Sequence, residues 1–569
     1  MSPEYEDYIY DQLDKETYSD YWKQIGLNCE EYIEQFADIP CLFLSGWYDI
    51  YCKSTIEFYL ALSNTKKSPI RLIMGPWQHV GTEGHVAGEV DFGVNALITG
   101  NLAPSVFSLS RRWFDRFTEP AQSSNKSEAK LQSAINQAQL QSINTTAPIG
   151  SHEPNITSLH AHTSSAYNQP SSISSTTQLQ PQPHPNTMPR GPYTSLSRLG
   201  TWQPPTVDAK SGPHLYVLPN ALPRDRIDTL DTPLPPNVRY FRMGGGDGHK
   251  TTQNCIFHGG VWMQSYTWPP NGTEYQNYYL SQRTLNNHKS DPRHSIDNTA
   301  EQLGNINIDS HLSNNTNSSA IPDGTDDIDA WQPIESTIGL RHDASQCTTF
   351  IYDPSSPQPS IGGHVFQHKN ILLGGSYDQV ERSDMFLCKP PYLPLSSRRD
   401  VTVYRSDVLT DRIDITGQPY VILYISSDCV DTDFYCKLID EYPPSNDYPL
   451  GFSMLITHGI QRCKMRLMNG RGNTPSLLKP NYIYKLRIDM YPTSNLFNKS
   501  HRIRLDISSS NFPHYDINQN TGQSMDSQDY YIARNTVYHN TIYQSRLVLP
   551  VQTMSQNTNS IHMEEATHH

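Results

Sequence analysis

An acidic and an imidazole side chain each follow a short apolar run near the start of the sequence. Asp49 comes soon after the run P-C-L-F-L-S at 40–45, and His79 comes soon after the run I-R-L-I-M at 70–74. A carboxylate held near an imidazole fixes its tautomer and stabilises the imidazolium that forms when the ring takes a proton from a hydroxyl. Acyl transfer requires this chemistry. Taken singly, Asp49 also fits a turn residue and His79 an ordinary loop histidine.

The elements that carry these two residues are expected to bring them together. Both apolar runs end at glycine and are typical of buried strands. Between them, Ser54 and Glu57 have the S-x-x-E spacing of a capping box, and apolar residues at helical spacing follow. The pattern predicts a β-α-β unit with parallel strands. Asp49 and His79 then lie on loops at the carboxyl edge of neighbouring strands, where open α/β sheets place their sites.

Two further patterns define the remaining ordered parts. A helix that packs on the sheet is predicted from one apolar stripe, formed by Val106, Leu109, Trp113, Phe114 and Phe117. After residue 330, short β-branched or aromatic runs alternate with turn residues; they lie at 401–404, 420–425, 434–439, 482–488, 503–507 and 547–551. Many strands without intervening helices predict an antiparallel sandwich or jelly roll.

Length and composition limit the classes of protein that this chain can represent. A chain of 569 residues is expected to fold as at least two units. Its formal net charge of −14 argues against nucleic acid or an anionic membrane surface as the main partner. No apolar stretch approaches the roughly 20 residues of a membrane span, and no secretory signal is visible. We therefore expect the chain as written to be cytoplasmic.

The cysteines predict neither a metal site nor a disulfide framework. The nine cysteines are widely spread, odd in number and contain no C-x-x-C pair. Polar, low-complexity stretches with few aromatic or branched apolar residues predict disordered insertions. The expected organisation is a cap-like helical segment at 1–36, an α/β region at 37–118, a disordered insertion at 119–200, a connection at 201–285, a second insertion at 286–330, the strand domain at 331–553 and a disordered tail at 554–569.

Several strings along the sequence resemble one family of hydrolases. In the first part these are S-G-W-Y-D at 45–49, G-P-W-Q-H at 75–79, G-E-V-D-F-G at 88–93 and R-W-F-D at 112–115. In later parts they are V-R-Y-F-R-M-G at 238–244, G-G-V-W at 259–262, W-P-P at 268–270, Y-D-P at 352–354, T-D-F at 432–434, R-I-R-L-D-I-S-S-S-N-F-P at 502–513 and N-T-V-Y-H at 535–539. Together they resemble the α/β-hydrolases grouped with bacterial cocaine esterase and Xaa-Pro dipeptidyl-peptidases.

The resemblance implies a fold, an activity and roles for three residues. The fold is the C-terminal part of an α/β-hydrolase core followed by an antiparallel, galactose-binding-like jelly roll. The activity is that of a serine hydrolase acting on a small peptide or ester, with Asp49 as the acid of the triad and His79 as the base. Tyr51, two places after the acid, lines the acyl pocket or serves in packing. No metal or organic cofactor is implied, and the family often forms dimers.

The nucleophile that this family requires is not found where its pattern places it. In α/β-hydrolases the serine lies on a G-x-S-x-G elbow that precedes the acid in the chain. Ser2, Ser19 and Ser45 are the serines before Asp49, and none has a glycine two places before and two places after. Ser376, in G-G-S-Y-D, is expected to lie in a turn without a catalytic role.

Two interpretations of the chain follow from the missing serine. In the first, this portion is inactive alone and works when an N-terminal hydrolase half supplies the nucleophile. In the second, it is a non-catalytic protein whose jelly roll serves binding or assembly.

Overall fold

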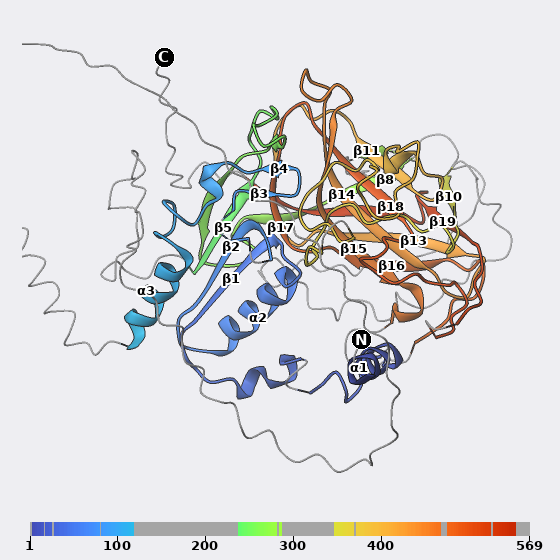
Figure 1. Cartoon of the computed structure of the whole chain (residues 1–569). Coiled ribbons are helices and arrows are strands. Elements are labelled where there is room, and N and C mark those ends of the chain that lie inside the picture. The colour runs from blue at the N-terminus through green and yellow to red at the C-terminus, as the bar shows by residue number, and fades with distance from the viewer. Residues whose placement is uncertain are drawn as a thin grey trace, which may run out of the picture. The chain divides into compact units, whose positions relative to one another are not determined.

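The computed structural model describes two long stretches of the chain and shorter pieces around them. The described residues are 3–15, 17–24, 28–79, 81–82, 84–118, 237–281, 284–286, 346–368, 371–467, 475–524 and 527–553. All of them belong to one compact unit (Figure 1). The predicted insertions at 119–200 and 286–330 and the predicted tail at 554–569 lie outside the described residues, except that Asn286 ends the short strand β9 (Thr284–Asn286).

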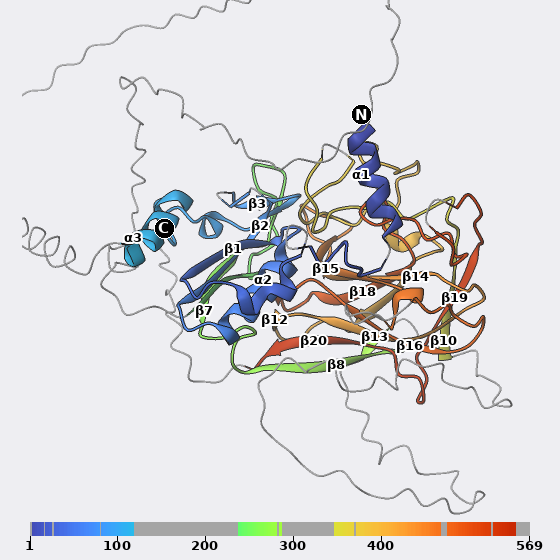
Figure 2. The same cartoon turned by 90° about the horizontal axis from the view of Figure 1, so that it is seen from below.

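The predicted β-α-β unit is present and carries the two candidate catalytic residues. Strands β1 (Cys41–Tyr48) and β2 (Ile70–Gln78) are parallel neighbours. Helix α2 (Cys52–Thr65) connects them and covers one face of the pair (Figures 1 and 2). The apolar side of α2 is buried because it packs on this sheet; it consists of Cys52, Ile56, Tyr59 and Leu62.

The start of α2 differs from the capping box that the sequence predicts. The helix begins at Cys52, and its N-cap residue Tyr51 makes no side-chain capping bond. Ser54 therefore lies inside the first turn, where its hydroxyl donates to the carbonyl of Tyr51 at 3.2 Å. The turn after β1 ends at Tyr51, so the helix begins two residues before Ser54.

Two strands from later in the chain extend the sheet. Strand β5 (Val238–Met243) pairs with β2 in parallel, and β7 (Gly260–Ser265) pairs with β5 in antiparallel register. The resulting order is β1-β2-β5-β7, so part of the predicted connection at 201–285 belongs to the same sheet. The remaining elements of the first part are α1 (Pro3–Asp14), η1 (Glu30–Gln35), β3 (Val86–Ala87), β4 (Val90–Asp91), η2 (Val94–Ala96) and β6 (Ile256–Phe257).

The second predicted helix forms, but its buried face is narrower than expected. Helix α3 (Val106–Thr118) buries Leu109 and Trp113, and Leu109 packs with Ile73 and Trp77 of β2. Phe114 is 64% exposed and Phe117 is 36% exposed. The sequence therefore predicts the helix correctly, whereas two of the five stripe residues face away from the sheet.

The C-terminal part consists of strands joined by turns. Six strands coincide with the predicted runs; they are β11 (Thr402–Ser406), β13 (Tyr420–Ser427), β14 (Asp433–Tyr442), β16 (Tyr484–Asp489), β18 (Arg502–Ser508) and β20 (Arg546–Gln552). The sequence analysis did not predict β8 (Thr273–Ser281), β10 (Cys347–Tyr352), β12 (Ile413–Gly417), β15 (Phe452–Arg462), β17 (Thr493–Phe497) and β19 (Ala533–Tyr538). From 346 to 553, the described residues contain no α-helix, only the short 3-10 turns η6 (Leu395–Ser397) and η7 (Cys463–Met465).

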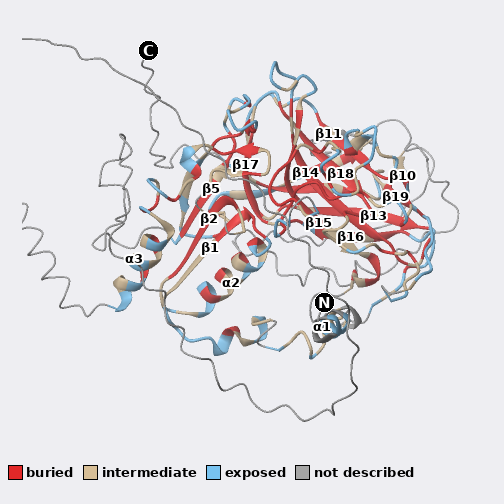
Figure 3. Ribbon diagram, in the orientation of Figure 1, coloured by how far each residue is buried: buried red, intermediate tan, exposed pale blue. Residues whose placement is uncertain are grey.

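Pairing among the C-terminal strands is antiparallel. One series of pairs runs β15-β14-β18-β11, and another joins β13 to β16, β19 and β20. Strand β14 is buried along nearly its whole length (Figure 3). Its alternate residues face two covered sides, and its buried apolar residues belong to a hydrophobic core that also includes residues of β1, β2 and α2.

Several contacts join the first sheet to the C-terminal strands. Strand β17 meets the end of β5 at Asn495 and Met243. Arg242 of β5 forms a 2.9 Å ion pair with Asp414 of β12. The hydroxyl of Tyr48, at the end of β1, donates to the carbonyl of Leu455 at 3.1 Å. The end of β1 that precedes Asp49 is thus anchored by a strand more than 400 residues away.

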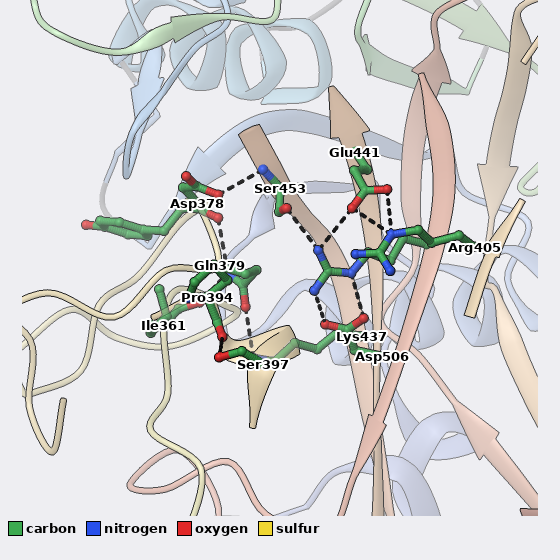
Figure 4. Close-up of polar contacts among 12 residues, drawn as sticks. Ile361, Asp378, Gln379, Pro394, Ser397, Arg405, Lys437, Glu441, Ser453 and Asp506 are labelled. Atoms are coloured by element: carbon green, nitrogen blue, oxygen red, sulfur yellow. Dashed lines mark hydrogen bonds and ion pairs between the residues drawn. The ribbon is translucent and has the colours of Figure 1, made fainter. Parts of the chain in front are cut away.

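Buried charges between β14, β15 and β18 form a network within the C-terminal region (Figure 4). The Arg504 guanidinium donates to both carboxylate oxygens of Asp506 at 2.7 and 2.6 Å. It also contacts Glu441 at 3.3 Å and the Ser453 hydroxyl at 3.0 Å. Two carboxylates thus compensate a guanidinium that is almost entirely removed from water.

Within the part of the chain that the structure describes, no helix combines the length and apolar character needed to cross a bilayer.

Candidate active site

A tight turn after β1 fixes the carboxylate of Asp49. The Asp49 amide donates to the carbonyl of Gly46 at 3.1 Å, and the Asp49 carbonyl accepts from the amide of Cys52 at 3.0 Å. One carboxylate oxygen, Oδ1, also accepts from the Tyr51 amide at 2.9 Å. The main chain of Asp49 is held on both sides of the turn and its carboxylate by the Tyr51 amide, immediately before α2 begins, so little freedom is left to the side chain.

A bulge in β2 brings His79 level with Asp49. Gly46 pairs with Gly75, but Tyr48 pairs with Gln78, so β2 uses one residue more than β1 over this interval. Without the extra residue, Asp49 would lie opposite Gln78. The bulge shifts the register by one and redirects the following side chain, so that His79 reaches the acid.

The two side chains are in contact. Nδ1 of His79 lies 3.2 Å from Oδ1 and 3.3 Å from Oδ2 of Asp49. The Asp49 side chain is 12% exposed, whereas that of His79 is 31% exposed. Because the carboxylate accepts from the Nδ1 proton, Nε2 is left as the basic nitrogen of the neutral ring. This tautomer is the one that a general base acting through Nε2 requires.

Two aromatic rings flank the His79 imidazole. The Tyr51 ring centroid lies 5.3 Å away and that of Phe366 lies 5.4 Å away. Both aromatic residues are about half exposed. The structure thus places Tyr51 beside the His79 imidazole. Phe366 was missed, because no local pattern in the sequence connects it with a residue 287 positions earlier.

Two buried tryptophans, Trp47 and Trp77, support the loops that carry the pair. The Trp47 indole donates to the carbonyl of Phe241 at 2.7 Å, and the Trp77 indole donates to that of Ala96 at 3.1 Å. Only glycine fits beneath Trp77. A Cβ atom on Gly46 would lie 2.1 Å from the Trp77 carbonyl oxygen, and one on Gly75 would lie 2.4 Å from the indole ring.

The serines singled out in the sequence do not face His79. Ser45 lies inside β1 and is buried. Ser376 is fully buried, and its hydroxyl donates to the carbonyl of Leu455 at 2.7 Å. Its backbone forms a β-bridge with Gly88, so Ser376 lies in a bridged, extended segment rather than in the turn that the sequence analysis expects. Neither hydroxyl is placed for attack on a substrate.

A second histidine–carboxylate pair lies nearby in the sequence and was not predicted. Nδ1 of His85 lies 2.7 Å from Oδ1 of Asp91, which also accepts from the amide of Gly93 at 2.8 Å. The His85 side chain is 28% exposed. This pair matches that of Asp49 and His79 in chemistry but occupies the short β3–β4 hairpin rather than the ends of the parallel strands.

The described residues contain no group of three or more His, Cys, Asp or Glu side chains arranged to hold a metal ion. The described side chains that the structure brings together at this site are a carboxylate, an imidazole and two aromatic rings.

Two family models match the sequence. The X-Pro dipeptidyl-peptidase C-terminal non-catalytic domain matches residues 233–548, and X-Pro dipeptidyl-peptidase of the S15 family matches residues 2–81. Among curated proteins, a cocaine esterase from Rhodococcus sp. (strain MB1 Bresler) is 36% identical over 208 residues. That alignment covers 36% of this chain and 32% of the esterase.

Solved structures with low sequence identity share the fold. An aminopeptidase from a marine sediment Thaumarchaeota archaeon is 15% identical with a TM-score of 0.52, and an α-amino acid ester hydrolase is 16% identical with a TM-score of 0.50. Both comparisons cover 96% of this chain and 60% of the solved chain. The present chain therefore corresponds to somewhat more than half the length of these proteins.

Proposed function

The chain belongs to the X-Pro dipeptidyl-peptidase family, and we propose that it forms part of a serine hydrolase in which Asp49 is the acid and His79 the base. One observation carries the proposal: at adjacent ends of parallel strands, Nδ1 of His79 lies 3.2 Å from the Asp49 carboxylate, which leaves Nε2 as the basic nitrogen for proton transfer. The site geometry and the family point to the same reaction class.

The proposed mechanism is acyl transfer to water through a serine ester. Nε2 of His79 removes the proton of the serine hydroxyl while the serine oxygen attacks the substrate carbonyl. His79 then gives that proton to the leaving group. Asp49 stabilises the imidazolium formed in between and keeps the ring oriented. Tyr51 lines the pocket that receives the acyl group, and its position beside the His79 ring supports this role.

We infer that the serine comes from strands that pair along the open edge of β1. Among the described residues, β1 pairs with β2 alone, and its first four residues are only partly buried. The nucleophile of an α/β-hydrolase precedes its acid in the chain. The serine is then supplied from an N-terminal hydrolase half, either continuous with this chain or a separate partner.

We also propose that the C-terminal strands form a jelly roll of the galactose-binding type. Support comes from their antiparallel pairing in two connected series and from the match to the family's C-terminal domain. The proposed substrate is a small ester or an Xaa-Pro peptide, because the relatives include a cocaine esterase and X-Pro dipeptidyl-peptidases. A purely binding role would leave the Asp49–His79 contact without a use.

The test is hydrolysis of esters and release of Xaa-Pro dipeptides from peptides by the full chain supplied with the serine-bearing hydrolase half. His79→Ala should lower kcat by at least about 10⁴-fold, because the base is lost. His85→Ala is the matched control: it removes an imidazole from a similar pair and should leave turnover unchanged.

The outcomes separate the two interpretations of the chain. Wild-type turnover of the His79→Ala variant would remove His79 from the mechanism. Without the added half, a fluorophosphonate probe should leave Ser376 unlabelled, and stoichiometric labelling of Ser376 would overturn the assignment of a missing nucleophile.

A further inference from the structure

The residue next to His79 is hydrogen-bonded to the C-terminal region. Gln78 is the last residue of β2, and its side-chain nitrogen Nε2 donates to the carbonyl of Gly374 at 2.8 Å. The two residues are separated by 296 positions. Gly374 lies within the family's C-terminal non-catalytic domain. The family's C-terminal non-catalytic domain therefore contacts the end of β2, next to His79.

The acceptor of this hydrogen bond is held firmly. Gly375, the next residue, exchanges backbone hydrogen bonds with Gly363 at 2.8 and 3.0 Å. Ser376 donates through its amide to Ala87 at 3.2 Å and accepts from the amide of Glu89 at 2.8 Å. The segment that contains Gly374 is thus held by backbone hydrogen bonds to Gly363 on one side and to the β3–β4 hairpin on the other.

The Gln78 side chain fits against this segment because residue 375 is a glycine. A Cβ atom on Gly375 would lie 2.4 Å from Nε2 of Gln78, and Gly375 has φ +98°, which disfavours other residues. The absence of a side chain at Gly375 leaves the space that the Gln78 amide occupies.

Gln78 also closes the turn that contains His79. Its carbonyl accepts from the amide of Gly81 at 3.1 Å. Its side chain and backbone together therefore tie the start of this turn to the C-terminal region and to the residue two places beyond His79.

We propose that Gln78 is a positioning residue: through Gly374, the C-terminal domain fixes the end of β2 and so holds the His79 imidazole against Asp49. This inference rests on the proposed role of His79 as the base and adds a task for the C-terminal domain. A merely structural role for the same hydrogen bond would affect stability without changing how His79 meets Asp49.

The experiment measures the rate at which diethyl pyrocarbonate modifies His79 in the full chain, by peptide mass spectrometry. The imidazole nitrogen bonds to a carbonyl carbon of the reagent and expels ethyl carbonate, so the rate reports how accessible the ring is. Gln78→Met keeps the length of the side chain and removes its amide. Asp49 covers Nδ1 and not Nε2 of His79. We therefore expect modification at Nδ1 to accelerate about fivefold, because the loss of one hydrogen bond raises the population of the released ring by about that factor.

The matched control is Gln418→Met. Gln418 donates from Nε2 to the carbonyl of Met490 at 3.1 Å, the same kind of bond made between two parts of the C-terminal region. Gln418→Met should shift the denaturant midpoint as Gln78→Met does, without altering the rate at which His79 is modified. His85 serves as an internal reference in every sample, and its modification rate should stay constant.

A second comparison tests whether Gln78 acts through the pair. Asp49→Asn should change the reactivity of His79 by itself, and adding Gln78→Met should then have no further effect. If Gln78→Met folds poorly, Gln78→Glu has the same shape without the Nε2 donor and should shift His79 reactivity in the same direction.

Three results would overturn the inference: an unchanged His79 rate, an equal change in Gln418→Met, or a full additional change in the Asp49→Asn background. The readout is independent of turnover. Failure of the hydrolase function would show as an active His79→Ala variant, whereas failure of this inference would show as unchanged His79 reactivity in a chain whose activity still needs His79.

Discussion

The α/β region and the C-terminal strands differ in where their polar side chains find partners. In the C-terminal strands, Arg504 and Asp506 are both buried and satisfied within the same region. The Asp49–His79 pair is partly exposed, and the C-terminal region supplies Phe366 beside the ring and Gly374 beside the preceding residue. The candidate chemistry therefore lies in the region that depends on the other for its geometry.

Apolar burial shows the same contrast. Strand β14 is buried at nine of its ten positions, whereas the first half of β1 is partly exposed (Figure 3). Phe107 and Phe114 of α3 are exposed as well. The C-terminal strand β14 is covered on both faces, while the α/β region keeps exposed apolar surface on β1 and α3.

The comparison can first be tested by breaking the charge network of the C-terminal strands. Asp506→Ala leaves the Arg504 guanidinium buried without its main partner and should lower the free energy of unfolding by about 3–5 kcal/mol. Denaturant unfolding measures this loss. The change should also release the α/β region, because that region is anchored on these strands.

The matched control for this change is Asp489→Ala. Arg487 and Asp489 repeat the Arg-x-Asp spacing on β16, at 2.8 Å, but both side chains are more than a third exposed. Removing this acid should cost less than about 1 kcal/mol. Equal losses for the two variants would contradict the view that burial makes the Arg504 network important.

A second test perturbs the α/β region alone. In Gly46→Ala the new methyl group would lie 2.1 Å from the Trp77 carbonyl oxygen, so the strands must separate. We expect a loss of up to about 3 kcal/mol, seen as faster hydrogen exchange in β1 and β2 while β14 and β18 stay protected. Gly81→Ala is the control, since its Cβ atom would meet nothing closer than 3.4 Å. Uniform loss of protection in all strands would show that the two regions unfold as one.

The smallest expected effect concerns a buried histidine cluster beneath the site. His364 stacks on Tyr491 at 4.1 Å and lies 4.9 Å from His458, which lies 4.9 Å from His514. Burial, with the neighbouring His514, lowers the pKa of His364 to about 3. Burial, with the nearby Lys437, lowers the pKa of His514 to about 4. These rings stay neutral in the folded chain under conditions that protonate them in the unfolded chain.

The sign of the pH dependence follows from these pKa shifts. An unfolded histidine titrates near pH 6.5, so stability is fully present above that pH and falls as the pH drops from 6.5 towards 3. For His364 the loss at pH 5 is about 2 kcal/mol. Burial raises the pKa of Asp431 to about 6, so its contribution to stability changes with pH in the opposite direction. That contribution is the same in the wild type and in a His364 variant, so it cancels when the two are compared.

Denaturant unfolding at pH 7 and pH 5 should therefore show a smaller loss in His364→Phe than in the wild-type chain, by about 2 kcal/mol. An identical loss in the two chains would show that His364 is not kept neutral by its surroundings. A difference would show that His364, whose ring lies 5.8 Å from that of Tyr48 at the end of β1, makes the stability of the fold pH-sensitive.

Local patterns predicted much of the fold because strands and helices leave periodic signals. The β-α-β unit and six C-terminal strands lie where apolar runs and turn residues indicate them. The start of α2 and the exposed side of α3 were missed. Backbone hydrogen bonds in the turn after β1 determine where α2 starts. The extent of the neighbouring sheet determines which side of α3 is exposed. The spacing of apolar residues indicates neither.

The sequence by itself determined that an acid and an imidazole occupy neighbouring ends of parallel strands, because consecutive strands joined by a helix must end at the same sheet edge. Only the tertiary structure decided that a bulge brings the two into contact, that Phe366 lies beside the ring and that Gln78 is bound to Gly374. Contacts between residues nearly 300 positions apart depend on how whole sheets pack, and such packing leaves no periodic signal in the chain.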